Sequence, residues 1–310
     1  MRLSMRRPES PSPFTITQET LKVSGRDVTC IQVAPKDTEP VGTPIVWHQG
    51  LGDNLSKIKT DLLTMAHATD AAGQAREIIG FIPGKRKLGW RRNLEKIKVP
   101  GGTVRASRES LLRADDVVKG LQEKQIKRAH LAGFSAGGIV VTLAAYQAHR
   151  EGDNPVDMVV PIQSGGMDNK GFMRTTGRVL LGGAKDTLNG LFEKKQSSDQ
   201  EEDIVSSTSS RLDQLKRLAS TIIATGRSRR LYLLFPELKD FVNLQVINGA
   251  GDWTFPRGPL KRRLKKMDIA VADLGWKRHN MGRGEQREER LTTIVNFILE
   301  KEGKISNTGG

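Results

Sequence analysis

The sequence has little of what marks a secreted, disulfide-bonded or membrane-spanning protein. Its 310 residues include one cysteine, Cys30, so no disulfide can form within the chain. Its longest apolar runs, such as residues 139–146, are shorter than the roughly 18 residues of a membrane-spanning helix. The basic residues near the start are not followed by the apolar run of a secretory signal. These absences predict a soluble, cytoplasmic protein.

Acidic residues are too few to balance the basic ones. There are 35 acidic and 50 basic residues, which gives a net charge of +15. Such an excess favours an anionic partner, which could be nucleic acid, a membrane surface or an anionic substrate. A generally basic surface without a partner is the alternative. Aromatic residues are only 5% of the chain and no nucleic-acid-binding signature is present, so nucleic acid is the weakest of these partners.

Stretches with the spacing of strands alternate with amphipathic stretches along most of the chain. The expected strands are a starting hairpin (14–23 and 27–34) and then 44–48, 77–82, 129–134, 158–163, 244–248 and 269–274. The expected helices are 53–72, 107–125, 136–149 and 285–301. This alternation predicts the α/β class, with a mostly parallel central sheet covered by helices on both faces.

The alternation stops between residues 165 and 242. This region contains glycine pairs and a polar stretch at 193–210, and it falls between two expected strands. So long an interruption inside a compact sheet is typical of an insertion. We therefore expect a core made of residues 1–164 and 243–310, with an inserted cap or lid at 165–242.

The segment Gly133-Phe134-Ser135-Ala136-Gly137 lies directly between an expected buried strand and an expected helix. A serine in this position needs a sharp turn, and small residues two positions to either side let strand and helix approach closely. The N–H groups around it lie at a helix N-terminus, where negative charge is favoured. An ordinary glycine-rich turn is the alternative.

These features resemble the α/β-hydrolase family, in which a nucleophilic serine is followed along the chain by an acid and then a histidine. The resemblance implies Ser135 as nucleophile. It implies His279 as base, because His279 is in a loop between the last expected strand and the final helix. It implies Asp252 as acid, after a strand and a glycine turn and shortly before a proline. Asp168 and Asp273 are alternatives for the acid.

The segment His48-Gln49-Gly50-Leu51-Gly52 resembles the oxyanion loop of the same family, with Gln49 inserted after the histidine. The resemblance implies that the backbone N–H groups of Leu51 and Ala136 bind the oxyanion. Gly50 is an alternative to Leu51, since the insertion changes the spacing. His48 would then have a structural role.

The resemblance implies a serine hydrolase that cleaves an ester, thioester or related acyl bond through an acyl-enzyme, with no metal or organic cofactor. Peptidase or acyl-transfer chemistry on the same triad is an alternative. A non-catalytic module that docks an anionic partner is a second class of function.

Basic residues follow three of the expected strands, at the same edge of the sheet as Ser135. We hypothesise that they form a positive rim, which favours anionic small-molecule acyl substrates or an anionic surface. They are Lys85, Arg86, Lys87, Arg91 and Arg92; Arg257, Lys261, Arg262, Arg263, Lys265 and Lys266; and Lys277, Arg278 and Arg283.

Overall fold

The computed structural model describes residues 12–50, 55–83, 94–152, 154–167, 228–249, 257–276, 281–282 and 284–306. One sheet dominates this part of the chain. Its strands are β1 (Phe14–Val23), β2 (Arg26–Pro35), β3 (Ile45–His48), β4 (Ile78–Pro83), β7 (Ala129–Phe134), β8 (Val156–Ile162), β9 (Asn243–Leu244), β10 (Val246–Ile247) and β11 (Val271–Ala272). They lie in the order β1-β2-β4-β3-β7-β8-β10-β11, and β9 also pairs with β8. The pairs β1–β2 and β2–β4 are antiparallel, and the pairs from β4 to β11 are parallel. The predicted mostly parallel sheet is confirmed.

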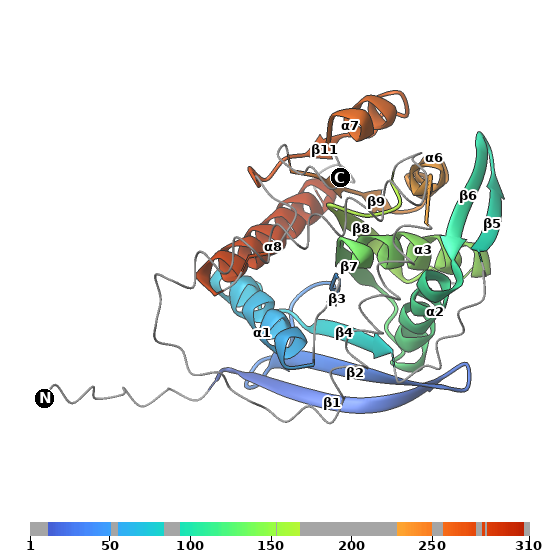
Figure 1. The fold of residues 1–310 in the computed structure, drawn as a ribbon. Coiled ribbons are helices and arrows are strands. Elements are labelled where there is room, and N and C mark those ends of the chain that lie inside the picture. The colour runs from blue at the N-terminus through green and yellow to red at the C-terminus, as the bar shows by residue number, and fades with distance from the viewer. Residues whose placement is uncertain are drawn as a thin grey trace, which may run out of the picture.

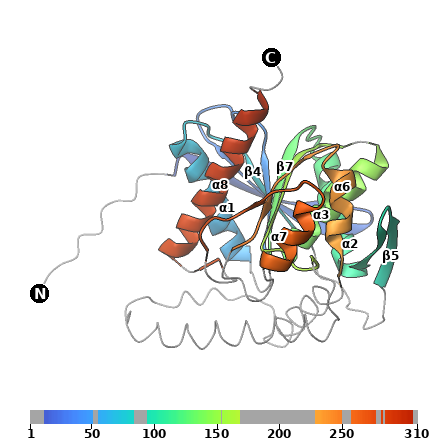
Figure 2. The ribbon, with the colours of Figure 1, turned by 90° about the horizontal axis from the view of Figure 1, so that it is seen from above.

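Helices cover both faces of the sheet (Figures 1 and 2). On one face α1 (Leu55–Ala71) packs against α8 (Glu285–Ser306), and on the other α2 (Arg108–Glu123) packs against α3 (Ala136–Glu151). Each face has its own hydrophobic core, because successive residues of a strand point to opposite faces. In β3, for example, Val46 packs toward α2 and α3, whereas Trp47 packs toward α1 and α8.

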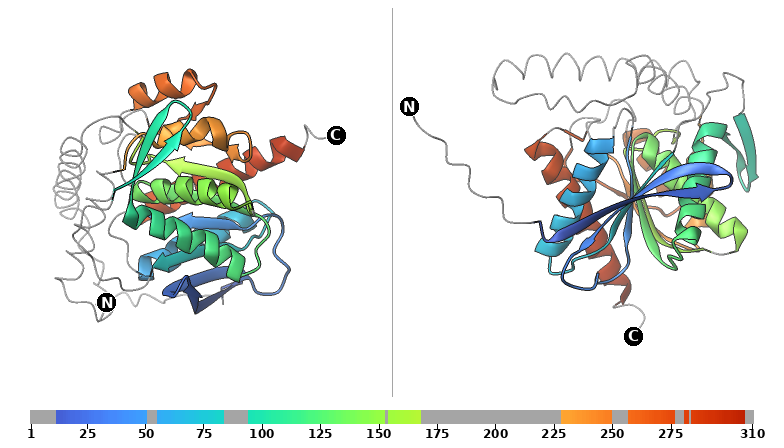
Figure 3. Two further views of the ribbon diagram at one scale, coloured as in Figure 1. Left: turned by 90° about the vertical axis from the view of Figure 1, so that its right-hand side faces the viewer. Right: turned by 90° about the horizontal axis from the view of Figure 1, so that it is seen from below.

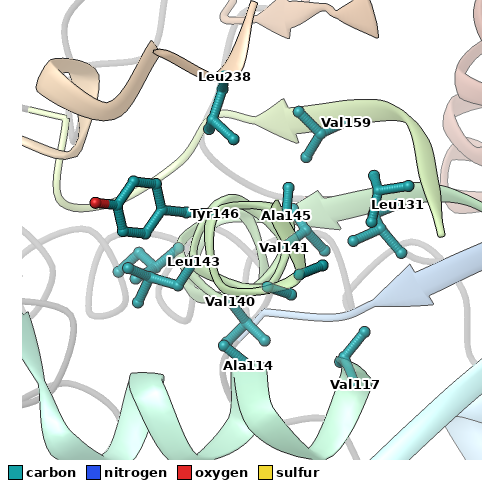
Figure 4. Packing of buried hydrophobic residues seen from close by; sticks show 14 of the residues in the cluster. Ala114, Val117, Leu131, Val140, Val141, Leu143, Ala145, Tyr146, Val159 and Leu238 are labelled. Carbon is teal, nitrogen blue, oxygen red and sulfur yellow. The ribbon is translucent and has the colours of Figure 1, made fainter. Parts of the chain in front are cut away.

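Helix α3 packs closely on the middle of the sheet (Figure 4). Val141 and Ala145 of α3 lie toward Leu131 of β7 and Val159 of β8. All six residues of β7 are buried, as expected for a parallel strand with both faces covered. This packing fixes the end of β7, and Ser135 is the next residue.

A second, two-stranded sheet was not predicted. It is the antiparallel hairpin β5 (Leu94–Val99) and β6 (Gly102–Ser107), which lies on the side of the molecule that also holds α2 and α3 (Figures 1 and 3). Ile97 and Val99 pack inward, while Lys98 between them is exposed. The alternation around the Pro-Gly-Gly turn at 100–102 is a hairpin signal that the sequence analysis missed.

The region predicted as a cap lies mostly outside the described residues, and its assignment to 165–242 stays a prediction. Its last part is described and contains η1 (Leu231–Leu234) and α6 (Phe235–Leu238). Leu231, Leu234, Phe235 and Leu238 are fully buried and belong to the same core as α3. In the described residues, no helix combines the length and apolarity that crossing a membrane requires.

Candidate active site

Ser135 occupies a sharp turn between β7 and α3. Its backbone has φ 56° and ψ −113°, a conformation that a residue with a side chain adopts only when its surroundings enforce it. The enforcing bonds come from β8 and the loop after it. The N–H of Ser135 donates to the Ile162 carbonyl at 2.9 Å, and its carbonyl accepts from the Gly165 N–H at 3.2 Å. The predicted strand–turn–helix is confirmed, while the catalytic role of Ser135 stays a prediction.

The glycines around Ser135 are required by close backbone contacts. A Cβ atom on Gly133 would lie 2.4 Å from the Gly137 carbonyl oxygen, across the turn. A Cβ atom on Gly137 would lie 2.0 Å from the carbonyl oxygen of His48. The Gly133–Gly137 contact is the close approach of strand and helix that the sequence predicted at this turn. The contact of Gly137 with His48 also brings the end of β3 against the first turn of α3, which was not predicted.

The loop after β3 lies against the same turn. A Cβ atom on Gly50 would be 3.2 Å from the Cβ of Ser135 and 3.3 Å from the Phe134 carbonyl oxygen. Ala136 is the first residue of α3, where backbone N–H groups lack helical partners. The structure thus brings Gly50 and Ala136 to Ser135. Leu51 lies outside the described residues, so its N–H remains a predicted oxyanion donor.

His48 is buried and holds the start of this loop. Burial, aided by the positive charge of Arg113, lowers the pKa of His48 to about 4. Its ring is therefore neutral at pH 7, and Nδ1 lies 3.1 Å from the carbonyl oxygen of Gln49. Because a carbonyl oxygen only accepts, Nδ1 carries the proton and donates it to Gln49. This contact fits the structural role expected for His48.

The lowered pKa of His48 predicts a loss of stability in mild acid. Between about pH 6.5 and pH 4 the unfolded chain binds a proton at His48 and the folded chain does not, so stability falls as the pH falls. We expect the wild type to lose up to about 3 kcal/mol more over this window than His48→Asn, which stays neutral throughout. Urea unfolding at several pH values measures the difference, and parallel curves for the two proteins would contradict it.

The loops predicted to hold the acid and the base begin side by side. Gly249 follows β10, and a Cβ atom there would lie 2.4 Å from the Trp276 carbonyl oxygen after β11. The same atom would lie 2.8 Å from Nε2 of Gln163, which follows β8. Asp252 and His279 lie three residues beyond Gly249 and Trp276, and both are outside the described residues.

These loop starts share one edge of the sheet with Ser135. Parallel strands have their carboxyl ends at the same edge, and β7, β8, β10 and β11 are parallel neighbours in that order. Asp252 and His279 themselves lie outside the described residues, so their distance from Ser135 and their roles remain predictions.

Of the alternative acids, the structure describes Asp273. Its side chain is exposed, and Oδ1 accepts the N–H of Gly275 in its own loop at 2.9 Å. This local bond is typical of a turn and leaves the carboxylate near solvent. Asp273 therefore suits a turn better than the support of a buried base. Asp168 lies outside the described residues.

Sequence reasoning missed a buried polar network behind the oxyanion loop. Asp61 of α1 is fully buried and binds Gln49, Trp47 and Arg287. The sequence contains a signal for this buried carboxylate. Asp61 lies at helical spacing between Ile58 and Met65, and so on the apolar face of its helix. Elsewhere among the described residues, no three His, Cys, Asp or Glu side chains gather in a way that could hold a metal ion.

No family model and no curated protein matches the sequence. Solved structures do match its fold. An esterase of Pyrobaculum calidifontis has a TM-score of 0.53 and 16% identity, over 94% of this chain and 85% of the esterase. A hydrolase of Pseudomonas aeruginosa has a TM-score of 0.53 and 15% identity, over 92% of this chain and 98% of that one. The chain has the α/β-hydrolase fold.

A third α/β-hydrolase-fold structure agrees with these two. A meta-cleavage product hydrolase of Pseudomonas fluorescens has a TM-score of 0.51 and 17% identity, over 91% of this chain and 97% of its own. Likeness at such low identity establishes the fold, and a fold does not fix an activity. The function of this α/β-hydrolase-fold chain therefore depends on Ser135 and the loops around it.

Proposed function

We propose that the chain is a serine hydrolase that cleaves esters, thioesters or related acyl bonds through a Ser135–His279–Asp252 triad. The observation that supports it most is the backbone of Ser135. Its positive φ places the residue at the end of a buried strand and the start of a helix, against the backbone of Gly50. A strained serine at the meeting point of several loops is unusual for a purely structural residue and typical of a functional one.

The proposed reaction has two steps. Ser135 Oγ attacks the acyl carbon while His279 accepts its proton, and Asp252 orients the imidazole and stabilises its charged form. The N–H groups of Leu51 and Ala136 bind the oxygen that becomes negative. His279 then gives the proton to the leaving oxygen or sulfur. Water, activated by the same histidine, attacks the acyl-enzyme and releases Ser135.

A substrate panel tests this proposal against its alternatives. We expect Ser135-dependent turnover of short acyl esters or thioesters, with slower cleavage of matched peptides. Ser135→Ala is the control, and its circular dichroism spectrum shows whether it folds. If the folded wild type and Ser135→Ala turn over the panel equally slowly, the enzyme proposal fails and the binding module is favoured. Transfer of the acyl group to an added alcohol in place of water would indicate an acyltransferase.

The positive rim remains a proposal about substrate charge. Of its three segments, only the one in α7 (Arg257–Lys265) is described, and there Lys261, Arg262 and Lys265 are exposed. The other two segments lie outside the described residues. If the rim attracts anionic acyl substrates, its effect must depend on salt, because ions screen exposed charges.

We expect kcat/KM for an anionic ester to fall several-fold as ionic strength rises from about 0.01 M to 0.15 M, over which the screening length shrinks from about 30 Å to 8 Å. A neutral ester of the same acyl length should change little. The triple substitution Lys261→Gln, Arg262→Gln and Lys265→Gln should flatten the response to the anionic ester. Equal responses to the two esters would instead indicate a generally basic surface.

A further inference from the structure

The carboxylate of Asp61 connects three elements behind the candidate active site. It belongs to α1 and has no exposed surface. Its Oδ2 accepts the indole N–H of Trp47 at 3.2 Å and an Nη2 hydrogen of Arg287 at 2.6 Å. Oδ1 accepts Nε of the same guanidinium, and Oδ2 also accepts the side-chain amide of Gln49. One buried charge thus joins α1, α8 and the loop after β3.

Stability alone is a poor explanation for this arrangement. Removing two charges from water costs several kcal/mol per ion, and well-packed apolar residues often replace a buried pair without loss. A leucine at position 61 could pack α1 against α8. It could not bind the amide of Gln49. That bond is therefore the specific consequence of having the Asp61–Arg287 pair at this place.

Gln49 is held from two sides next to the nucleophile turn. Its carbonyl oxygen accepts Nδ1–H of His48, and its side chain is held by Asp61. A Cβ atom on Gly137 would lie 2.7 Å from that carbonyl oxygen, so the peptide lies directly on the first turn of α3. The next peptide groups along the chain are those of Gly50 and Leu51, the candidate oxyanion donors.

We propose that Asp61, fixed by Arg287, is a positioning residue that sets the oxyanion loop through the side chain of Gln49. This inference rests on the proposed hydrolase function. Misplacing a catalytic group by about 1 Å can slow a reaction about 100-fold, so oxyanion donors must be held firmly in place. A loop held only by its backbone would therefore give slower turnover. Gln49 is the residue inserted into the family's loop pattern. Its side chain is the group through which Asp61 holds the loop.

The same network reaches the other side of the site. Arg287 is in the first turn of α8, the helix that follows the loop predicted to hold the base. One turn further along, the guanidinium of Arg290 lies over the ring of Trp276, 5.3 Å from its centroid. Trp276 is the last described residue before the loop predicted to hold the base. The first two turns of α8 therefore contact Trp276 directly and Gln49 of the oxyanion loop through Asp61.

Three variants test whether Asp61 acts through Gln49. Gln49→Met removes the amide but keeps the length of the side chain. Asp61→Leu with Arg287→Met removes both charges together, so no unpaired ion is left buried. The third combines all three changes. We expect each to keep KM within about threefold and to lower kcat about 10- to 100-fold. The pH profile, which reports the base, should not move.

The decisive comparison is between the combined variant and the other two. If Asp61 acts through Gln49, the kcat of the combined variant equals that of Gln49→Met alone, because the second change has nothing left to affect. Additive losses would show that Asp61 acts elsewhere and overturn the inference. Wild-type kcat in Gln49→Met would overturn it as well.

Glu302→Gln is the matched control for loosening α8. Glu302 pairs with Arg76 and His130 at the opposite end of the helix. His130 precedes Ser135 by five residues along β7, about 16 Å away. We expect this variant to have a lower Tm and unchanged kcat, and a kcat loss matching that of Gln49→Met would overturn the inference. A wild type without Ser135-dependent turnover would instead refute the proposed function, and the inference with it.

Discussion

Replacement of His279 by alanine is expected to lower kcat/KM for the best ester substrate by about 10⁴-fold or more. Without a base, the Ser135 hydroxyl would have to lose its proton to water, and the oxyanion donors alone would provide the remaining rate. The control is His67→Ala, since His67 is exposed on α1. Its activity should stay within about twofold of wild type. A His279→Ala enzyme with near-normal turnover would remove the proposed base.

The acid can be identified in the same series. Asp252→Asn should lower kcat by about 10⁴-fold, because the amide no longer stabilises the charged imidazole or fixes its tautomer. Asp273→Asn should stay near wild type, because the Asp273 side chain is exposed and bound within its own turn. If Asp168→Asn shows the large loss instead, the acid follows β8 and the assignment of Asp252 is wrong.

Substitution of Gly137 by alanine is expected to destabilise the protein by roughly 3 kcal/mol or more and to abolish activity in the fraction that folds. The added Cβ would lie 2.0 Å from the His48 carbonyl oxygen and 2.7 Å from that of Gln49. Both are backbone atoms, so relief requires moving the oxyanion loop or the first turn of α3. Guanidinium unfolding and ester turnover measure the two effects.

Gly303→Ala is the matched control for this change. Gly303 lies in α8, and a Cβ atom there would meet nothing within 4 Å. Alanine in an exposed helix position should stabilise the protein by about 0.5–1 kcal/mol and leave activity unchanged. If Gly137→Ala were as well tolerated as Gly303→Ala, the close contact between the first turn of α3 and the oxyanion loop would be wrong.

Much of the fold could be predicted because its signals are local. Parallel strands buried on both faces are mostly apolar, so β7 and β8 were recognisable from a few consecutive residues. Helix α2 was recognisable from its apolar periodicity, and the hydroxyl of its N-cap, Ser107, accepts the N–H of Ser110. The turn at Ser135 was recognisable because its glycines lie within five residues of sequence.

What could not be predicted depends on contacts between distant residues. Asp61 and Arg287 are separated by 226 positions. Nothing in the sequence around either residue indicates that the two meet beside the loop that contains Gln49. An aspartate on an apolar helix face indicates a buried partner without identifying it. The β5–β6 hairpin was missed for a different reason. Its exposed face is charged, and its inward face is formed by a small set of apolar residues, which are Ile97 and Val99 in β5 and Val104 and Ala106 in β6.

The most direct test of the central claim is covalent labelling with a fluorophosphonate, followed by mass spectrometry of the digested protein. Such a probe reacts with a serine that is activated by a base and an oxyanion hole. We predict one adduct per chain, on the peptide that contains Ser135, and none in folded Ser135→Ala. Folded wild type that takes up no probe, or takes it up equally in Ser135→Ala, would contradict the assignment of Ser135 as the nucleophile.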